Sequence, residues 1–96
     1  MGLPLIELEV ERMVELSKMW GWALVSKRVI DQLIEIVLVK VLQRHEEETR
    51  DAFWMHVRNV FNTFQWKILE ETTEENTLTI RAEKGVISEE SLGEGE

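Results

Sequence analysis

The hydrophobic residues of the first segment, residues 4–20, recur with the period of an amphipathic helix. Pro4 suits a first helical position and Gly21 suits a C-terminal cap. An alternation of apolar and acidic residues over 6–11 is also typical of a strand, but we favour a helix. The face expected to point inward consists of Ile6, Val10, Met13, Val14, Ser17 and Trp20.

The longest periodic segment is residues 26–46, and we expect it to form the central helix. Its first half separates into a polar and an apolar side. In its second half Leu38, Val39 and Leu42 fall on the side that was polar, so this end would be apolar nearly all round. A strand over 34–42 is the alternative, because the run is rich in β-branched residues.

A third helix is expected over residues 48–64, where aromatic and aliphatic residues share one side. The period then changes from helical to two, which predicts a β-hairpin with strands at about 66–72 and 77–84. The pattern therefore predicts an α+β, mainly helical fold: one domain over 1–84, followed by an acidic mobile tail over 85–96. We see no internal repeat.

The apolar excess of the central helix predicts self-association, because a short chain has few layers with which to cover a second apolar face. The candidate interface is made of Leu38, Val39 and Leu42. Trp20 and Trp22 flank Gly21 at the corner between the first two helices. These two indoles form either a partner hot spot or the packing of a tight corner, and we include them in the candidate interface.

Charge is distributed unevenly along the 96 residues, whose net charge is −8. Residues 1–69 carry ten acids and nine bases, whereas residues 70–96 carry nine acids and two bases. An acidic end of this kind either confers solubility or tunes a partner that handles nucleic acid. The chain has no cysteine, which excludes disulfides and thiolate metal sites. We find no pattern typical of a membrane span or a secretory leader, and expect a cytoplasmic protein.

One enzyme-like pattern is present, in which Arg50 and His56 are separated by five residues. It resembles the Arg-x4-6-His motif of HEPN ribonucleases. The resemblance implies that Arg50 and His56 would form a composite active site assembled across a dimer. A structural role for the two residues is the alternative that we favour.

Three helices followed by a hairpin would also fit a winged-helix DNA reader. The acids of the hairpin argue against it, because DNA binding draws largely on Lys and Arg side chains. We expect no cofactor and no metal, since His45 and His56 lack the spacing of paired ligands. The sequence thus favours a non-enzymatic protein–protein interaction module, as a homodimer or an accessory subunit of a larger complex.

Overall fold

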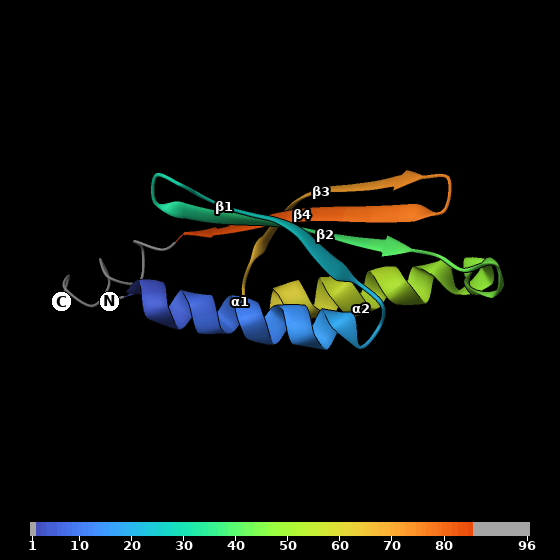
Figure 1. Ribbon diagram of the computed structural model, residues 1–96, viewed down its shortest axis with the longest axis horizontal. Helices are drawn as coiled ribbons and strands as arrows, with labels where there is room; N and C mark the ends of the chain where they lie inside the picture. Colours follow the sequence, from blue (N-terminus) through green and yellow to red (C-terminus); the bar gives the residue numbers. More distant parts are fainter. Residues whose placement is uncertain (1, 86–96) are drawn as a thin grey trace.

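In the computed structural model, which describes residues 2–85, two helices lie on one side of a four-stranded antiparallel sheet (Figure 1). The strand order is β1-β2-β4-β3, so β2 and β4 are central and β1 and β3 form the edges. The elements are α1 (Gly2–Lys18), β1 (Ala23–Ile30), β2 (Leu33–Val41), the 3-10 helix η1 (Arg44–Thr49), α2 (Arg50–Thr63), β3 (Lys67–Glu74) and β4 (Thr77–Gly85).

The expected mainly helical fold, with helices over 4–20, 26–46 and 48–64, is therefore wrong. Helices do form at α1 and α2, but residues 26–46 form most of the β1–β2 hairpin and then part of η1. The C-terminal hairpin expected at 66–72 and 77–84 is confirmed by β3 and β4. Apart from Gly85, the expected acidic tail lies outside the residues that the structure describes.

The sequence of the central segment predicted a helix because β2 is apolar on both of its faces. Ile34, Ile36 and Leu38 are fully buried beneath the helices, as alternate residues of a strand should be. Val37 and Val39, on the other face, are also apolar, so the polar alternation that identifies a half-buried strand is lost. The chain reverses before β2 at Asp31, whose φ of 56° is a turn conformation.

One hydrophobic core lies between the helices and the two central strands. Helix α1 contributes Ile6, Val10 and Met13, and α2 contributes five residues that include Val57 and Phe61. The core is completed by alternate residues of β2 and β4 and by the two tryptophans that precede β1 and β3. Its members are Ile6, Val10, Met13, Trp22, Ile34, Ile36, Leu38, Leu42, Phe53, Trp54, Val57, Val60, Phe61, Trp66, Leu78, Ile80 and Ala82.

The order of elements shows that the fold contains the same αββ unit twice, with equivalent residues 44 positions apart. Each helix is followed by a residue of positive φ, Gly21 at 89° after α1 and Gln65 at 65° after α2. A buried tryptophan follows in each unit, Trp22 or Trp66. The expectation that the chain has no internal repeat is therefore wrong.

Backbone details repeat between the two units as well. The amide of Trp22 donates to the Ser17 carbonyl at 3.1 Å, and the amide of Trp66 donates to the Phe61 carbonyl at 2.8 Å. Each edge strand has an irregularity at the same place, after Leu24 in β1 and after Ile68 in β3. The two hairpin turns share a positive φ at Asp31 and Glu75.

The two units are joined where β2 pairs with β4. Val37 lies opposite Arg81 in this pairing, and these two residues are also equivalent by the 44-residue offset. A position that pairs with its own equivalent lies on the axis that relates the units. The sheet thus has an approximate two-fold axis between Val37 and Arg81, and any difference between its halves can be read position by position.

Candidate interaction surface

The face of the sheet turned away from the helices is the candidate functional surface. Its residues are those that alternate with the buried positions of each strand and lie beside one another in the strand register. On the first hairpin this open face consists of Ala23, Ser26, Arg28, Ile30, Leu33, Glu35, Val37, Val39 and Val41. On the second hairpin it consists of Lys67, Glu70, Thr72, Glu74, Thr77, Thr79, Arg81, Glu83 and Gly85.

The two halves of the open face differ in chemistry although they share one backbone. Six of the nine open-face residues of the first hairpin carry an apolar side chain, and none of the nine on the second hairpin does. For example, the equivalent of Val39 is Glu83. On the first hairpin, Ile30 is 42% exposed to solvent and Val41 is 56% exposed. Antiparallel sheets normally present polar residues on the face that meets water. The second hairpin follows this rule and the first hairpin does not.

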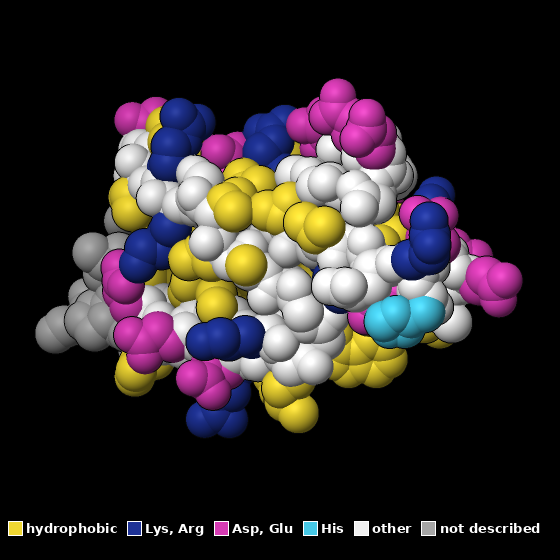
Figure 2. Space-filling view, turned by 45° about the vertical axis from the view of Figure 1, so that its right-hand side comes forward, with side chains coloured by type: hydrophobic (Ala, Val, Ile, Leu, Met, Phe, Trp, Pro, Cys, Tyr) yellow, Lys and Arg dark blue, Asp and Glu magenta, His cyan; other side chains and the backbone are white. Residues whose placement is uncertain are grey.

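The exposed apolar residues are not confined to one element. Figure 2 shows hydrophobic side chains gathered in the middle of one face of the molecule, with charged side chains around them. The large hydrophobic residues with the greatest exposure are Leu8, Met19, Trp20, Leu24, Val25, Val29, Ile30, Leu33, Val41 and Met55. Six of these ten belong to β1 and β2, so the first hairpin carries the largest share.

A ladder of ion pairs crosses the open face from one edge to the other. Arg28 on β1 lies 3.4 Å from Glu35 on β2, which lies 2.8 Å from Arg81 on β4, which in turn lies 3.0 Å from Glu70 on β3. The hydrogen bond from Arg81 lowers the pKa of Glu35, and the same bond raises the pKa of Arg81. The ladder joins all four strands. Val37, Val39 and Val41 lie along β2 between the ladder and the end of the first hairpin that is remote from its turn.

The five residues of the predicted interface lie in two different environments. Leu38, Leu42 and Trp22 are at most 2% exposed and belong to the core of the single chain. Val39 lies on the open face, and Trp20 is 40% exposed. The structure thus leaves Trp20 exposed and Val39 half-buried on the open face, and it brings Val39 together with Val37 and Val41, which the sequence did not single out. The signal that could have found these two is the apolar residue at every second position of a strand.

Trp20 stacks on the imidazole of His56, with ring centroids 4.6 Å apart and an angle of 14° between the planes. It also meets the edge of Phe53 at 5.5 Å. His56 Nε2 lies 3.0 Å from the Leu16 carbonyl, which can only accept, so this nitrogen is the donor. The contacts of Trp20 and His56 therefore hold the C-terminal end of α1 against α2.

The Arg50 and His56 pair of the HEPN-like motif does not share partners. His56 is held by α1, whereas Arg50 contacts Glu47 of η1 at 3.9 Å. The composite site that the resemblance implies needs both side chains turned toward one substrate. Each is instead engaged in a contact that supports the fold.

A winged helix needs three helices before its wing, whereas residues 2–85 contain two α-helices and the expected wing is part of the four-stranded sheet. The basic residue on the exposed side of α2, Arg58, donates to Glu71 at 2.8 and 2.7 Å. His45 lies exposed in η1. Within residues 2–85 no three His, Cys, Asp or Glu side chains are grouped closely enough to hold a metal ion.

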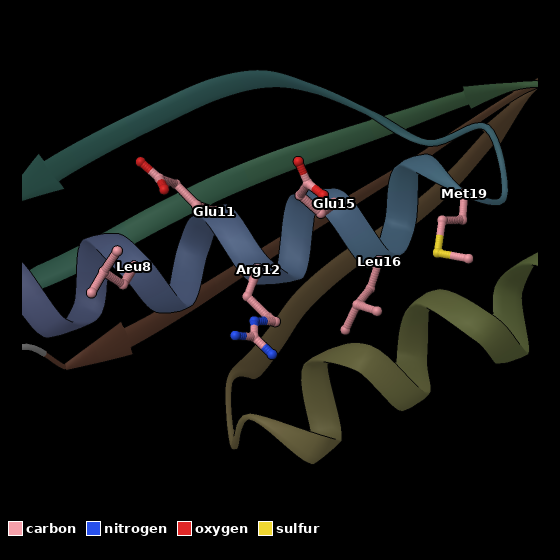
Figure 3. Close-up of a pocket in the computed structure, with 6 residues that line it drawn as sticks. All are labelled: Leu8, Glu11, Arg12, Glu15, Leu16 and Met19. Atoms are coloured by element: carbon pink, nitrogen blue, oxygen red, sulfur yellow. The ribbon is translucent and has the colours of Figure 1, made fainter.

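Two shallow hollows flank α1. The larger, of about 560 Å³, is lined by Leu8, Glu11, Arg12, Glu15, Leu16 and Met19. In Figure 3 Arg12, Leu16 and Met19 point toward α2, whereas Glu11 and Glu15 point the other way. These polar groups diverge, so the larger hollow lacks the convergent polar groups of a small-molecule site.

No protein family matches the chain, and no curated protein is similar to it. Neither α-helix within residues 2–85 has the length and apolar composition that crossing a lipid bilayer requires.

Proposed function

We propose that this chain is a protein–protein interaction module that forms a homodimer through the open face of its first hairpin. The observation that carries the proposal is the difference between the two halves of the sheet. The same backbone position holds Val39 in one half and Glu83 in the other, so the fold itself does not require the apolar residue. An exposed apolar patch that the fold does not require is typical of an interaction site.

A second copy suits this surface for two reasons. The open face of the first hairpin holds one base, Arg28, and one acid, Glu35, so it is locally neutral although the chain carries −8. Its valines are small and β-branched, and such side chains allow two sheets to pack about 10 Å apart. When two sheets pack face to face about a two-fold axis that runs across their strands, the first hairpin of one copy contacts the first hairpin of the other. An isologous dimer requires a self-complementary contact of this kind.

Enzymatic and DNA-binding roles are not part of the proposal. Arg50 and His56 contact η1 and α1, and Arg58 is paired with Glu71. The open face carries the argument without them.

Light scattering over a range of concentrations tests the proposal. We expect a particle of about twice 11.3 kDa for the natural chain. In Val39→Glu the dimer dissociation constant should rise at least about a hundredfold, because an isologous interface buries the new carboxylate twice. The fold should tolerate the change, since Glu83 already occupies the equivalent position.

Met55→Glu is the matched control, because it makes the same charge change on the exposed side of α2, where Met55 is 60% exposed. It should leave the dimer intact. A mass of one chain at every concentration would overturn the proposal. So would a dimer that Met55→Glu dissociates and Val39→Glu does not, since the interface would then lie on the helical layer.

A further inference from the structure

A groove between α1 and the edge strand β1 is the second place where the two αββ units differ. It has a volume of about 270 Å³. Its floor is apolar, and charged side chains from both elements stand around it. The lining residues are Val10, Glu11, Val14, Glu15, Lys18, Leu24 and Lys27.

In the second unit the equivalent space between α2 and β3 is bridged by an ion pair. Arg58 donates two hydrogen bonds to Glu71, at 2.8 and 2.7 Å, and its guanidinium also lies 5.5 Å from the Trp54 ring. The residues equivalent to Arg58 and Glu71 are Val14 and Lys27, which cannot form such a pair. In the first unit α1 and β1 are joined instead by the exposed Lys27–Glu7 pair, and the groove lined by Val14 and Leu24 stays open.

The groove runs beside a strand whose outer edge is unpaired within residues 2–85, since β1 is the first strand of the sheet. Leu24 and Val29, on the helix side of β1, are 37% and 56% exposed. An edge strand offers a row of backbone donors and acceptors to another extended chain. An added strand would place every second side chain next to Leu24 and Val29, along the groove.

Charge indicates which kind of strand fits. The charged residues of β1 are Lys27, on the helix side, and Arg28, on the open face, and both are basic, whereas α1 contributes Glu11, Glu15 and Lys18 to the groove. An added strand pairs directly with β1, so the two bases are its cross-strand neighbours. Pairing β1 with β1 of a second copy would bring these bases together across the strands, which is destabilising. Lys27 now contacts Glu7 in an exposed pair at 2.9 Å, with side-chain exposures of 35% and 42%. An exposed pair of this kind is readily exchanged for another acid.

We propose that the free edge of β1 and the adjoining groove bind an extended segment of a partner protein in which an apolar residue is followed by two acidic residues. In an antiparallel arrangement the apolar residue lies opposite Val29 and the acids lie opposite Arg28 and Lys27. A second apolar residue further along reaches Leu24 and the groove floor. Of these residues only Arg28 also belongs to the open face; Lys27, Leu24, Val29 and the groove lie on the helix side of β1, so the proposal does not rest on the homodimer.

The test uses a synthetic peptide, Thr-Val-Glu-Glu-Thr-Val, and its counterpart with two lysines in place of the glutamates. Backbone amide shifts of the labelled protein are followed during each titration. The acidic peptide should shift the amides of Ala23–Ile30 and leave those of Lys67–Glu74, the equivalent edge, unchanged. The lysine peptide should bind at least about tenfold more weakly, which corresponds to about 1.4 kcal/mol.

Lys27→Glu adds a reciprocal test that loss of folding cannot imitate. This variant should weaken the acidic peptide and strengthen the lysine peptide, with the folded state checked by circular dichroism. Equal binding of the two peptides to the natural chain would overturn the proposal, as would shifts at β3 or no binding of the acidic peptide. Concentration-dependent shifts of β1 without any peptide in Val39→Glu, which should not dimerise through the open face, would also overturn it, because a second copy would then occupy the edge.

Discussion

Lys40 and Lys84 occupy equivalent positions on the two central strands, yet their charges are neutralised by different elements. Lys84 Nζ donates to Glu9 of α1 at 2.7 Å. Lys40 Nζ donates to Glu46 of η1 at 3.0 Å and lies 4.6 Å from the centroid of the Phe53 ring. Phe53 is the equivalent of Glu9, so the two units share the lysine but not its acid.

Replacing Glu9 by alanine should destabilise the fold. Glu9 Oε2 accepts both from Lys84 and from Trp66 Nε1, at 2.7 and 2.8 Å, and Trp66 is only 4% exposed. Its loss leaves a buried indole donor without an acceptor, which costs about 2 kcal/mol in the free energy of unfolding. Urea unfolding measures this value.

Glu7→Ala is the control for this change, because Glu7 lies on the same helix and forms an exposed pair with Lys27. Its effect should stay within about 0.5 kcal/mol. Equal destabilisation by the two substitutions would show that Glu9 acts only through helix α1 itself and not through Trp66.

Substitutions in the turns that follow the two helices should have opposite effects on stability. Gly21 has a φ of 89°, and an added Cβ would lie 2.7 Å from Lys40 Nζ, so Gly21→Ala should cost about 1 to 3 kcal/mol. The equivalent Gln65 holds a φ of 65° with a side chain, and Gln65→Gly should stabilise by up to about 1 kcal/mol. Thermal unfolding of both variants gives the two signs, and the same sign in both would contradict the equivalence of the two turns.

The Arg58–Glu71 pair should make stability depend on pH in the acid range. Hydrogen bonds from Arg58 hold the pKa of Glu71 below its ordinary value of 4.5. Because the folded state has the lower pKa, this contribution is complete above that value and is lost as the pH falls through the folded-state pKa. Glu71→Gln should therefore flatten the pH dependence of the free energy of unfolding between about pH 5 and pH 3.

Urea unfolding at several pH values measures this slope. Glu75→Gln is the matched control, since Glu75 lies in the turn of the same hairpin and has no ion pair with any of residues 2–85. An unchanged slope in Glu71→Gln, or an equal change in both variants, would show that the ion pair with Arg58 does not cause the effect.

Periodicity predicted the elements whose two sides differ in polarity. The third expected helix and the C-terminal hairpin fit this description, because Val57 and Phe61 are buried while Arg58 and Asn62 are exposed. The β1–β2 hairpin was missed because its outward side is apolar too. The property that hid the hairpin from the sequence is the one that makes it the candidate interface.

The internal repeat left too little identity to be seen in the sequence. Of the positions compared over β1–β2 and β3–β4, only the pairs Trp22/Trp66, Ile36/Ile80 and Lys40/Lys84 hold the same residue. Backbone geometry at the turns and bulges carries the rest of the repeat, and a positive φ at Gln65 or Asp31 cannot be read from residue type. The sequence identified only part of the candidate site. Val39 was chosen as a surface residue of an expected helix, whereas it lies on a strand.

The two αββ units of the chain are arranged like the two subunits of a dimer that have been linked covalently. Each half presents one central strand, and the pairing of β2 with β4 joins the halves as two subunits would be joined. The segment from Gln43 to Thr49 is then a tether, which keeps each half at a high effective concentration next to the other. Because the tether links the two halves covalently, their association does not depend on how dilute the protein becomes.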